Sequence, residues 1–119
     1  IGITPSGWYD WTTKSLEADT PDLKNLQPLL ERCREAGIGL IGMKTGRYLA
    51  PMESAGKGDP AAFDKVYDEK FKTSPLNSFQ RAYAYVLEHG LDVVNADMQN
   101  FKHLEENILA AATSHTYFG

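Results

Sequence analysis

The sequence contains a single cysteine, Cys33, among its 119 residues. One thiol cannot form a disulfide within the chain, so the sequence is compatible with a reducing compartment such as the cytoplasm. No apolar run approaches the ~20 residues that a membrane-spanning helix needs, and no signal peptide opens the chain. We therefore expect no membrane insertion.

Positive charge is also scarce. Lysine and arginine number 12 against 16 aspartate and glutamate residues, which gives a net charge of -4 without any basic cluster. Such a balance argues against a nucleic-acid-binding surface. Residues 1–119 have the length of one domain or part of one, with no internal boundary. Because the chain starts with Ile1 in what resembles the tail of a strand, we expect a processed product or an excised piece.

The stretch from Gly37 to Arg47 organises the rest of the chain. Ile38 to Met43 form a short apolar run that ends abruptly in the polar, glycine-containing segment Lys44 to Arg47. This pattern predicts a strand buried on both faces, as in a parallel sheet. Ligands bind at the carboxyl ends of such strands, where Lys44 stands. The alternative is a core strand followed by a solvated loop.

The first residues contain an unusual group of aromatic side chains. Ile1 to Thr4 read as the end of a strand, and the turn signal Pro5-Ser6-Gly7 follows. Trp8, Tyr9 and Trp11 come next, and we expect them in a loop. They form either a hydrophobic plug or a platform for a ligand.

Thr20-Pro21-Asp22 predicts the start of a helix that Gly37 ends. Its apolar face combines four leucines with the cysteine, and Cys33 is expected to be an inert core thiol. The residues of this face are Leu23, Leu26, Leu29, Leu30 and Cys33.

The second half of the chain predicts three more helices and one strand. Asp59-Pro60 and Ser74-Pro75 are helix starts, Gly90 ends the second of these helices, and Leu91 to Ala96 form a strand. Asn100 is expected to cap the last helix. The side chains expected to face the core are Phe63, Tyr67 and Phe71 in the first helix, Leu76, Phe79, Tyr83, Val86 and Leu87 in the second, and Phe101, Leu104, Ile108 and Ala111 in the last.

This order of elements predicts an α/β fold. Strands that alternate with helices form parallel sheets joined by right-handed crossovers. The βα unit recurs about three times, and so few strands leave two sheet edges that need a partner.

Several stretches resemble the aldo/keto reductases. They are Gly37-Ile38-Gly39-Leu40-Ile41-Gly42-Met43-Lys44, Arg81-Ala82-Tyr83-Ala84-Tyr85-Val86-Leu87, Asp92-Val93-Val94 and Asn100-Phe101-Lys102-His103-Leu104-Glu105-Glu106-Asn107. The resemblance spans residues 20 to 112 and follows the order of the family's last three βα units, in the subgroup whose seventh strand ends in Met-Lys. The implied fold is the carboxyl-terminal part of an eight-stranded (β/α)8 TIM barrel, which needs about 250 residues when complete.

The resemblance implies part of an NAD(P)-dependent oxidoreductase that acts on a carbonyl or alcohol substrate. The family takes its catalytic aspartate, tyrosine, lysine and histidine from the amino-terminal half of the barrel. No catalytic residue and no metal ligand is therefore assigned to this chain, and Lys44 is not the catalytic lysine. As an isolated chain of 119 residues it is expected to be inactive.

The resemblance also implies a binding site for the cofactor's pyrophosphate. In the family the loop after the seventh strand lies along the pyrophosphate, and here that loop contains Lys44, Thr45 and Arg47. Cations and closely approaching backbone N–H groups suit phosphate oxygens. Met43 stands where many members have a tyrosine that stacks on the nicotinamide. The aromatic residues Trp8, Tyr9 and Trp11 are the candidates for that contact and for the substrate rim.

The start of the last helix holds the adenine end of the cofactor in the family. The matching positions are His103, Glu106 and Asn107. His103 and Asn107 are four residues apart and share one flank of the helix, while Glu106 is expected to point away from the core stripe. An ordinary solvated helix face is the alternative. His103 stands where the family has the arginine that meets the adenosine 2′-phosphate, and Asp97 stands where it has another basic residue. An acid repels the 2′-phosphate that distinguishes NADP from NAD, so the resemblance implies NADP or NAD as the cofactor.

Two other hypotheses stay open. The chain could be a non-catalytic half-barrel that acts as an interaction or assembly module, or a small independent α/β ligand-binding domain. A half-barrel is expected to bind the missing amino-terminal half or to associate with itself through its sheet edges.

Overall fold

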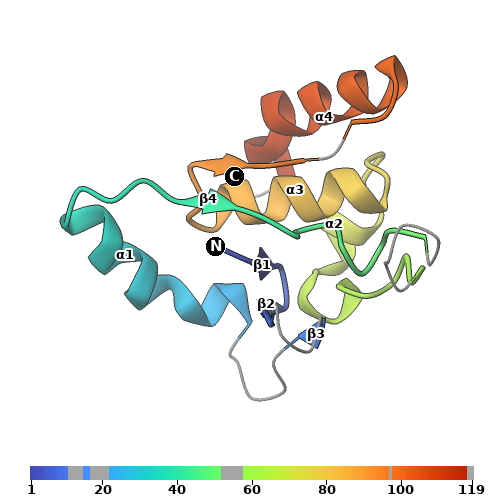
Figure 1. The fold of residues 1–119 in the computed structure, drawn as a ribbon. Coiled ribbons are helices and arrows are strands. Elements are labelled where there is room, and N and C mark those ends of the chain that lie inside the picture. The colour runs from blue at the N-terminus through green and yellow to red at the C-terminus, as the bar shows by residue number, and fades with distance from the viewer. Residues whose placement is uncertain (11–14, 17–21, 52–57, 97, 118–119) are drawn as a thin grey trace.

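The structure is a computed structural model that describes residues 1–10, 15–16, 22–51, 58–96 and 98–117. Over these residues the chain forms an α/β domain with two small β-sheets and four α-helices (Figure 1). The strands are β1 Ile3–Thr4, β2 Gly7–Asp10, β3 Ser15–Leu16, β4 Ile41–Gly42 and β5 Val93–Val94. The helices are α1 Gln27–Glu35, α2 Glu69–Lys72, α3 Ser78–Glu88 and α4 Phe101–Thr113, with 3₁₀ turns at Leu23–Leu26, Asp64–Val66 and Ser114–Tyr117.

Three segments that are far apart in the sequence run parallel to one another. β4 pairs with β5, with Ile41 opposite Val93. On the other side of β4, Gly2 forms a parallel bridge to Met43, whose N–H donates to the carbonyl of Ile1 at 2.7 Å. The parallel arrangement predicted from the sequence is confirmed, but the regular strands are much shorter than the apolar runs that predicted them.

Hydrogen bonds between Asp92 and Leu40 join the two segments at the beginning of this parallel pair. Its carboxylate accepts a hydrogen bond from the Leu40 N–H at 2.8 Å. The Leu40 carbonyl in turn accepts from the N–H groups of Asp92 and Val93, at 3.0 and 3.2 Å. These three bonds set the register of the two strands.

The aromatic segment near the N-terminus is a strand rather than the predicted loop. β1 and β2 form an antiparallel hairpin with Ile3 opposite Trp8, and β2 continues the sheet to β3. Gly7 follows the turn with a φ of 111°, a conformation that favours glycine. Trp8 is half-buried and packs against the core, whereas Trp11 lies outside the described residues.

The first predicted helix exists, but its buried face differs from the prediction. A 3₁₀ turn at Leu23–Leu26 precedes α1, and Gly37 follows α1 with a φ of 76°. A 3₁₀ turn has fewer residues per turn than an α-helix, so it shifts the phase of the apolar face. Leu29 is consequently 48% exposed and Cys33 only half-buried. The predictions for these two side chains were wrong.

The predicted helix after Asp59-Pro60 is interrupted. A 3₁₀ turn at Asp64–Val66 is followed by extended backbone at Tyr67, and α2 starts afresh. Asp68 is its N-cap, because its carboxylate accepts from the Phe71 N–H at 2.8 Å. The predicted aromatic side chains are nevertheless buried, with the rings of Tyr67 and Phe71 edge to face at 4.9 Å.

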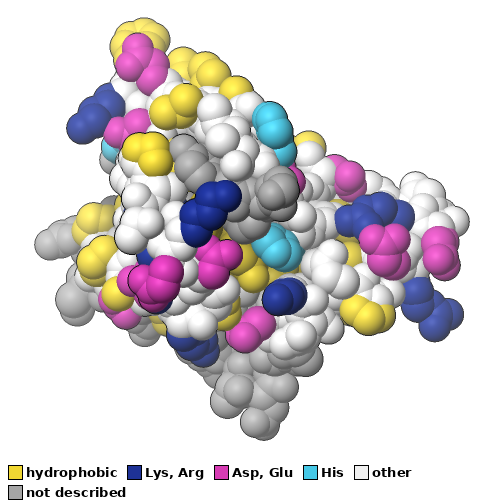
Figure 2. Space-filling view, turned by 180° about the vertical axis from the view of Figure 1, so that it is seen from behind, with side chains coloured by type: hydrophobic (Ala, Val, Ile, Leu, Met, Phe, Trp, Pro, Cys, Tyr) yellow, Lys and Arg dark blue, Asp and Glu magenta, His cyan; other side chains and the backbone are white. Residues whose placement is uncertain are grey.

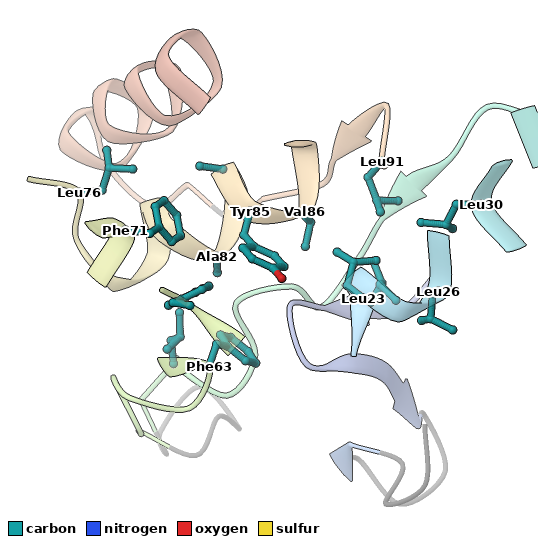
Figure 3. Packing of buried hydrophobic residues seen from close by; sticks show 14 of the residues in the cluster. Leu23, Leu26, Leu30, Phe63, Phe71, Leu76, Ala82, Tyr85, Val86 and Leu91 are labelled. Carbon is teal, nitrogen blue, oxygen red and sulfur yellow. The ribbon is translucent and has the colours of Figure 1, made fainter. Parts of the chain in front are cut away.

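α3 is the central helix of the core. It starts a few residues later than predicted, at a capping box in which Asn77 and Gln80 exchange hydrogen bonds. Its buried residues extend around most of the helix. Figure 3 shows Tyr85 and Val86 of α3 between the leucines of the α1 region on one side and Phe63, Phe71 and Leu76 on the other. We therefore assign most of the hydrophobic stabilisation to burial around α3.

α4 packs on α3 with a different face from the predicted one. Asn100 caps the helix as predicted, its side chain accepting from the His103 N–H at 2.9 Å. Phe101 is 84% exposed and Ile108 is 59% exposed, so their predicted burial was wrong; Leu104 and Ala111 are exposed as well. Hydrophobic side chains gather at the end of the molecule that α4 occupies (Figure 2).

The polar side of α4 is the one that faces α3. Gln80 of α3 donates to the Glu106 carbonyl at 3.0 Å, and Ser114 donates to the Glu88 carboxylate at 2.5 Å. Ala110 between them is fully buried. Hydrogen bonds to α3, rather than the larger apolar residues, therefore fix the orientation of α4.

The stability of the fold should depend on the protonation of His89. The imidazole stacks on the Tyr85 ring at 3.9 Å, and its Nδ1 lies 2.7 Å from the Tyr85 carbonyl. Burial lowers the pKa of His89. The unfolded chain, with a histidine pKa of about 6.5, thus binds the proton better, and stability falls as the pH drops below that value.

We expect His89→Gln to remove this part of the pH dependence. Urea unfolding of the two proteins at pH 7.5 and pH 5 measures the difference. The wild type should lose more free energy of unfolding between the two conditions than the variant. Equal losses would show that His89 is not responsible.

Candidate functional site

A cavity of about 590 Å³ lies at the carboxyl ends of the parallel strands. It collects side chains from the segment after β4, the segment after β5, one side of α3 and the first turns of α4. Its lining residues are Met43, Lys44, Thr45, Gly46, Arg47, Ala50, Pro51, Phe79, Tyr83, Asn95, Ala96, Gln99, His103, Glu106 and Asn107. The sequence assigned six residues to a cofactor, three in the segment after β4 and three in α4, and all six line this cavity.

The parallel pairing explains this convergence. β4 and β5 run in the same direction, so the segments that follow them leave from the same edge of the sheet. Asn95 marks this edge, because its N–H donates to the Gly42 carbonyl at 2.8 Å. Lys44 and His103, which are far apart in the sequence, thereby reach one cavity.

The backbone turns sharply at Lys44. Its φ of 63° lies in the left-handed region, which a residue with a Cβ rarely adopts. The Arg47 N–H donates to the Lys44 carbonyl at 3.0 Å and closes the turn. Strained backbone of this kind is often found at binding sites.

Thr45 holds the turn against the first parallel segment. It is 1% exposed, and its hydroxyl donates to the Ile3 carbonyl at 2.9 Å. The hydroxyl is therefore engaged within the protein. A contact of Thr45 with a cofactor stays a prediction. Because the hydroxyl is already engaged, such a contact would involve the backbone of Thr45.

The α4 side of the cavity is polar. The Nδ1 atom of His103 accepts from the Gln99 N–H at 3.3 Å, which places the proton of the neutral ring on Nε2. Glu106, which was expected to point away from the stripe of Phe101, Leu104 and Ile108, lines the cavity. It is half-buried, and its carboxylate accepts from Asn77 Nδ2 at 3.0 Å.

Two buried donors of the lining lack a partner among the described residues: Asn107 Nδ2 and Arg47 Nε. Buried donors in proteins are nearly always satisfied, so such atoms call for an acceptor. Both residues line the cavity, Arg47 from the segment after β4 and Asn107 from α4. Lys44 and Arg47 supply two positive charges against the single carboxylate of Glu106.

Sequence reasoning missed four polar or aromatic residues of the lining: Phe79, Tyr83, Asn95 and Gln99. Asn95 was placed inside the strand predicted over Leu91 to Ala96, but the observed strand ends at Val94, which leaves Asn95 and Gln99 in the segment that follows it. Phe79 and Tyr83 were assigned to the buried stripe of their helix, and nothing in the sequence distinguishes a core aromatic from one at a cavity wall.

The expected substrate-rim residues are not at this cavity as far as they are described. Trp8 packs against the core and is absent from the lining. Tyr9 lies on β2, although its side chain is not described, and Trp11 and Asp97 fall outside the described residues. Their roles stay predictions.

In the part of the chain that the structure describes, no three His, Cys, Asp or Glu side chains gather as metal ligands would. None of the helices described above has the length and apolar character to cross a membrane.

Comparisons with protein-family models, with curated proteins and with solved structures find no match to this chain. The geometry of the cavity therefore carries the functional argument.

The strained turn gives a test that needs no ligand. A left-handed non-glycine residue costs about 1–2 kcal/mol, while glycine adds about 0.5–1 kcal/mol of unfolded-state entropy. We therefore expect Lys44→Gly to leave the free energy of unfolding unchanged or to raise it by up to about 1 kcal/mol.

Chemical denaturation measures this effect. Arg32→Gly, within α1, is the matched control and should lose about 1 kcal/mol. A loss at Lys44→Gly as large as that of the control would contradict the strained conformation.

Proposed function

We propose that this chain is the cofactor-binding, carboxyl-terminal part of an NAD(P)-dependent oxidoreductase similar to the aldo/keto reductases. One observation carries the proposal. Lys44 and Arg47, which the resemblance assigns to the pyrophosphate of a nicotinamide dinucleotide, line the same cavity as His103 and Asn107, which it assigns to the adenine end. The two groups come from different βα units, and the parallel pairing of β4 and β5 brings them to one edge of the sheet.

The chemistry of the cavity supports an anionic, acceptor-rich ligand. Its volume of about 590 Å³ lies within the ~300–1,000 Å³ of typical small-molecule sites. Lys44 and Arg47 stand at the strand ends, where phosphates bind in α/β proteins. Arg47 lines the cavity, and a guanidinium is well suited to pyrophosphate oxygens.

The α4 wall suits the adenine end. Asn107 contributes a side-chain amide to the lining, and His103 contributes a flat imidazole with a donor at Nε2. Both NAD and NADP satisfy this description. The cofactor, when bound in a complete enzyme, would supply hydride-transfer chemistry, whereas this chain's own residues would bind and orient it.

The bare face of the parallel sheet supports membership of a larger barrel. Ile41 and Val93 are opposite one another in the register, and they are 54% and 52% exposed. Parallel sheets normally have both faces covered. In a complete (β/α)8 barrel these side chains would lie in the interior, and the family's catalytic residues would come from the other strands.

Binding of the cofactor to this chain tests the proposal. Titration with NADH and with NADPH should give saturable binding to the wild type. Lys44→Ala should weaken it by about 1–3 kcal/mol, the range for a hydrogen bond to a charged group.

Lys70→Ala is the matched control, because it removes the same charge from an exposed site on α2 outside the cavity. It should leave the affinity unchanged. Absence of binding of either nucleotide at millimolar concentration, or equal effects of the two variants, would overturn the proposal.

The exposed face of the parallel sheet leads to a second prediction, which concerns self-association of the chain. If it belongs to a barrel interior, the isolated chain should self-associate at micromolar concentration, because exposed apolar surface and open sheet edges attract partners. Sedimentation measures the state. Ile41→Thr combined with Val93→Thr should reduce association, and Leu29→Gln on α1, another exposed apolar residue, should not.

Two alternatives predict different results. A cooperatively unfolding monomer would favour an independent α/β ligand-binding domain, for which the continuous core around α3 is the supporting observation. Association that depends on Phe101 and Ile108 instead of the sheet would favour a non-catalytic interaction module, since these α4 side chains are also exposed.

A further inference from the structure

The aromatic side chains Phe79 and Tyr83 of α3 lie directly under the turn that carries Lys44 and Arg47. A Cβ on Gly46 would come within 3.0 Å of Phe79 Cδ1 and 3.2 Å of the Tyr83 hydroxyl oxygen. Both distances are shorter than ordinary contacts. The backbone of the turn therefore rests on this pair, and a Cβ at residue 46 would require the turn or the rings to shift by a few tenths of an ångström.

The turn is also fixed from its other side. Thr45, next to Gly46, bonds to the Ile3 carbonyl at 2.9 Å. The Gly46 carbonyl accepts from the N–H groups of Leu49 and Ala50 at 3.0 and 3.1 Å. The turn is thus held between the first parallel segment and α3, with Lys44 before the fixed point and Arg47 after it.

We propose that Phe79 and Tyr83 are positioning residues that set where Lys44 and Arg47 present their charges to a phosphate-bearing ligand. This inference rests on the proposed cofactor-binding function. A cation contributes to binding only where it meets the ligand's oxygens, since Coulomb attraction and hydrogen bonding fall off with distance. A turn that moves away from α3 carries both cations with it.

The competing view is that the pair simply fills the core. Phe79 packs against the buried cluster, and its ring lies 6.4 Å from that of Tyr83, so shortening it would destabilise the protein in either case. Stability alone does not separate the two views. The separating quantity is the coupling between α3 and Lys44 in ligand affinity.

A double-mutant cycle measures this coupling on the 119-residue chain. The affinity for NADH or NADPH, whichever the wild type binds more tightly, is determined for wild type, Lys44→Ala, Phe79→Leu and the double variant. Phe71→Leu replaces Phe79→Leu in a parallel cycle. Phe71 is a buried core aromatic that does not line the cavity.

We expect Lys44→Ala to weaken binding at least about fivefold in the wild-type and Phe71→Leu backgrounds. In the Phe79→Leu background, its effect should fall below twofold. Equal effects in all three backgrounds would overturn the positioning role while leaving the proposed function intact. Failure of the wild type to bind either nucleotide would overturn both.

Gly46→Ala provides a second route if Phe79→Leu does not fold. Its added methyl pushes the turn away from the same ring edge while α3 stays unchanged. The effect of Lys44→Ala should shrink in this background as well. An undiminished effect there would also contradict the proposal.

Discussion

The parallel pairing of three short segments is the constraint on which the site depends. Met43 is joined to Ile1 and Ile3, and β4 is joined to β5. Because all three run in one direction, the loops that follow β4 and β5 leave from a single edge. The Leu40 carbonyl and the Asp92 carboxylate fix this register at its beginning, and the hydrogen bond from the Asn95 N–H to the Gly42 carbonyl fixes it at its end. A slip of one residue would move Lys44 away from the α4 wall.

The second constraint is the orientation of α4. A helix usually buries its larger apolar side chains, yet this one leaves Phe101 and Ile108 exposed and presents His103, Glu106 and Asn107 to the cavity. An arrangement that buries amides and a carboxylate needs compensation. Hydrogen bonds from Asn77 and Gln80 supply it at Glu106, whereas Asn107 Nδ2 has none from the described residues.

Much of the architecture was predictable from local patterns. The strand end at Lys44, the Asn100 cap and the helix stop at Gly90 follow from residue types whose preferences are backbone effects. Those preferences act within a few residues of the chain. The alternation of strands and helices adds that the strands are parallel, and parallel strands place the polar residues that follow them at one edge.

The remainder depends on tertiary packing, which local patterns do not encode. The phase of the first helix changed because the 3₁₀ turn at Leu23–Leu26 preceded α1. The exposed face of α4 could not be read from its apolar spacing, because hydrogen bonds to α3 decide the orientation. Likewise, Phe79 reads as core in the sequence, and only its distance from Gly46 reveals its place at the cavity wall.

The central claim is that the turn after β4 and the start of α4 form one binding site for a phosphate-bearing nucleotide. The most direct measurement is the change in amide chemical shifts when ADP-ribose, which lacks the nicotinamide, is added to the isotope-labelled protein. The account predicts shifts concentrated at Lys44 to Arg47 and at His103 to Asn107, including the side-chain amide of Asn107. Shifts confined to other parts of the protein, or none at millimolar ligand, would contradict it.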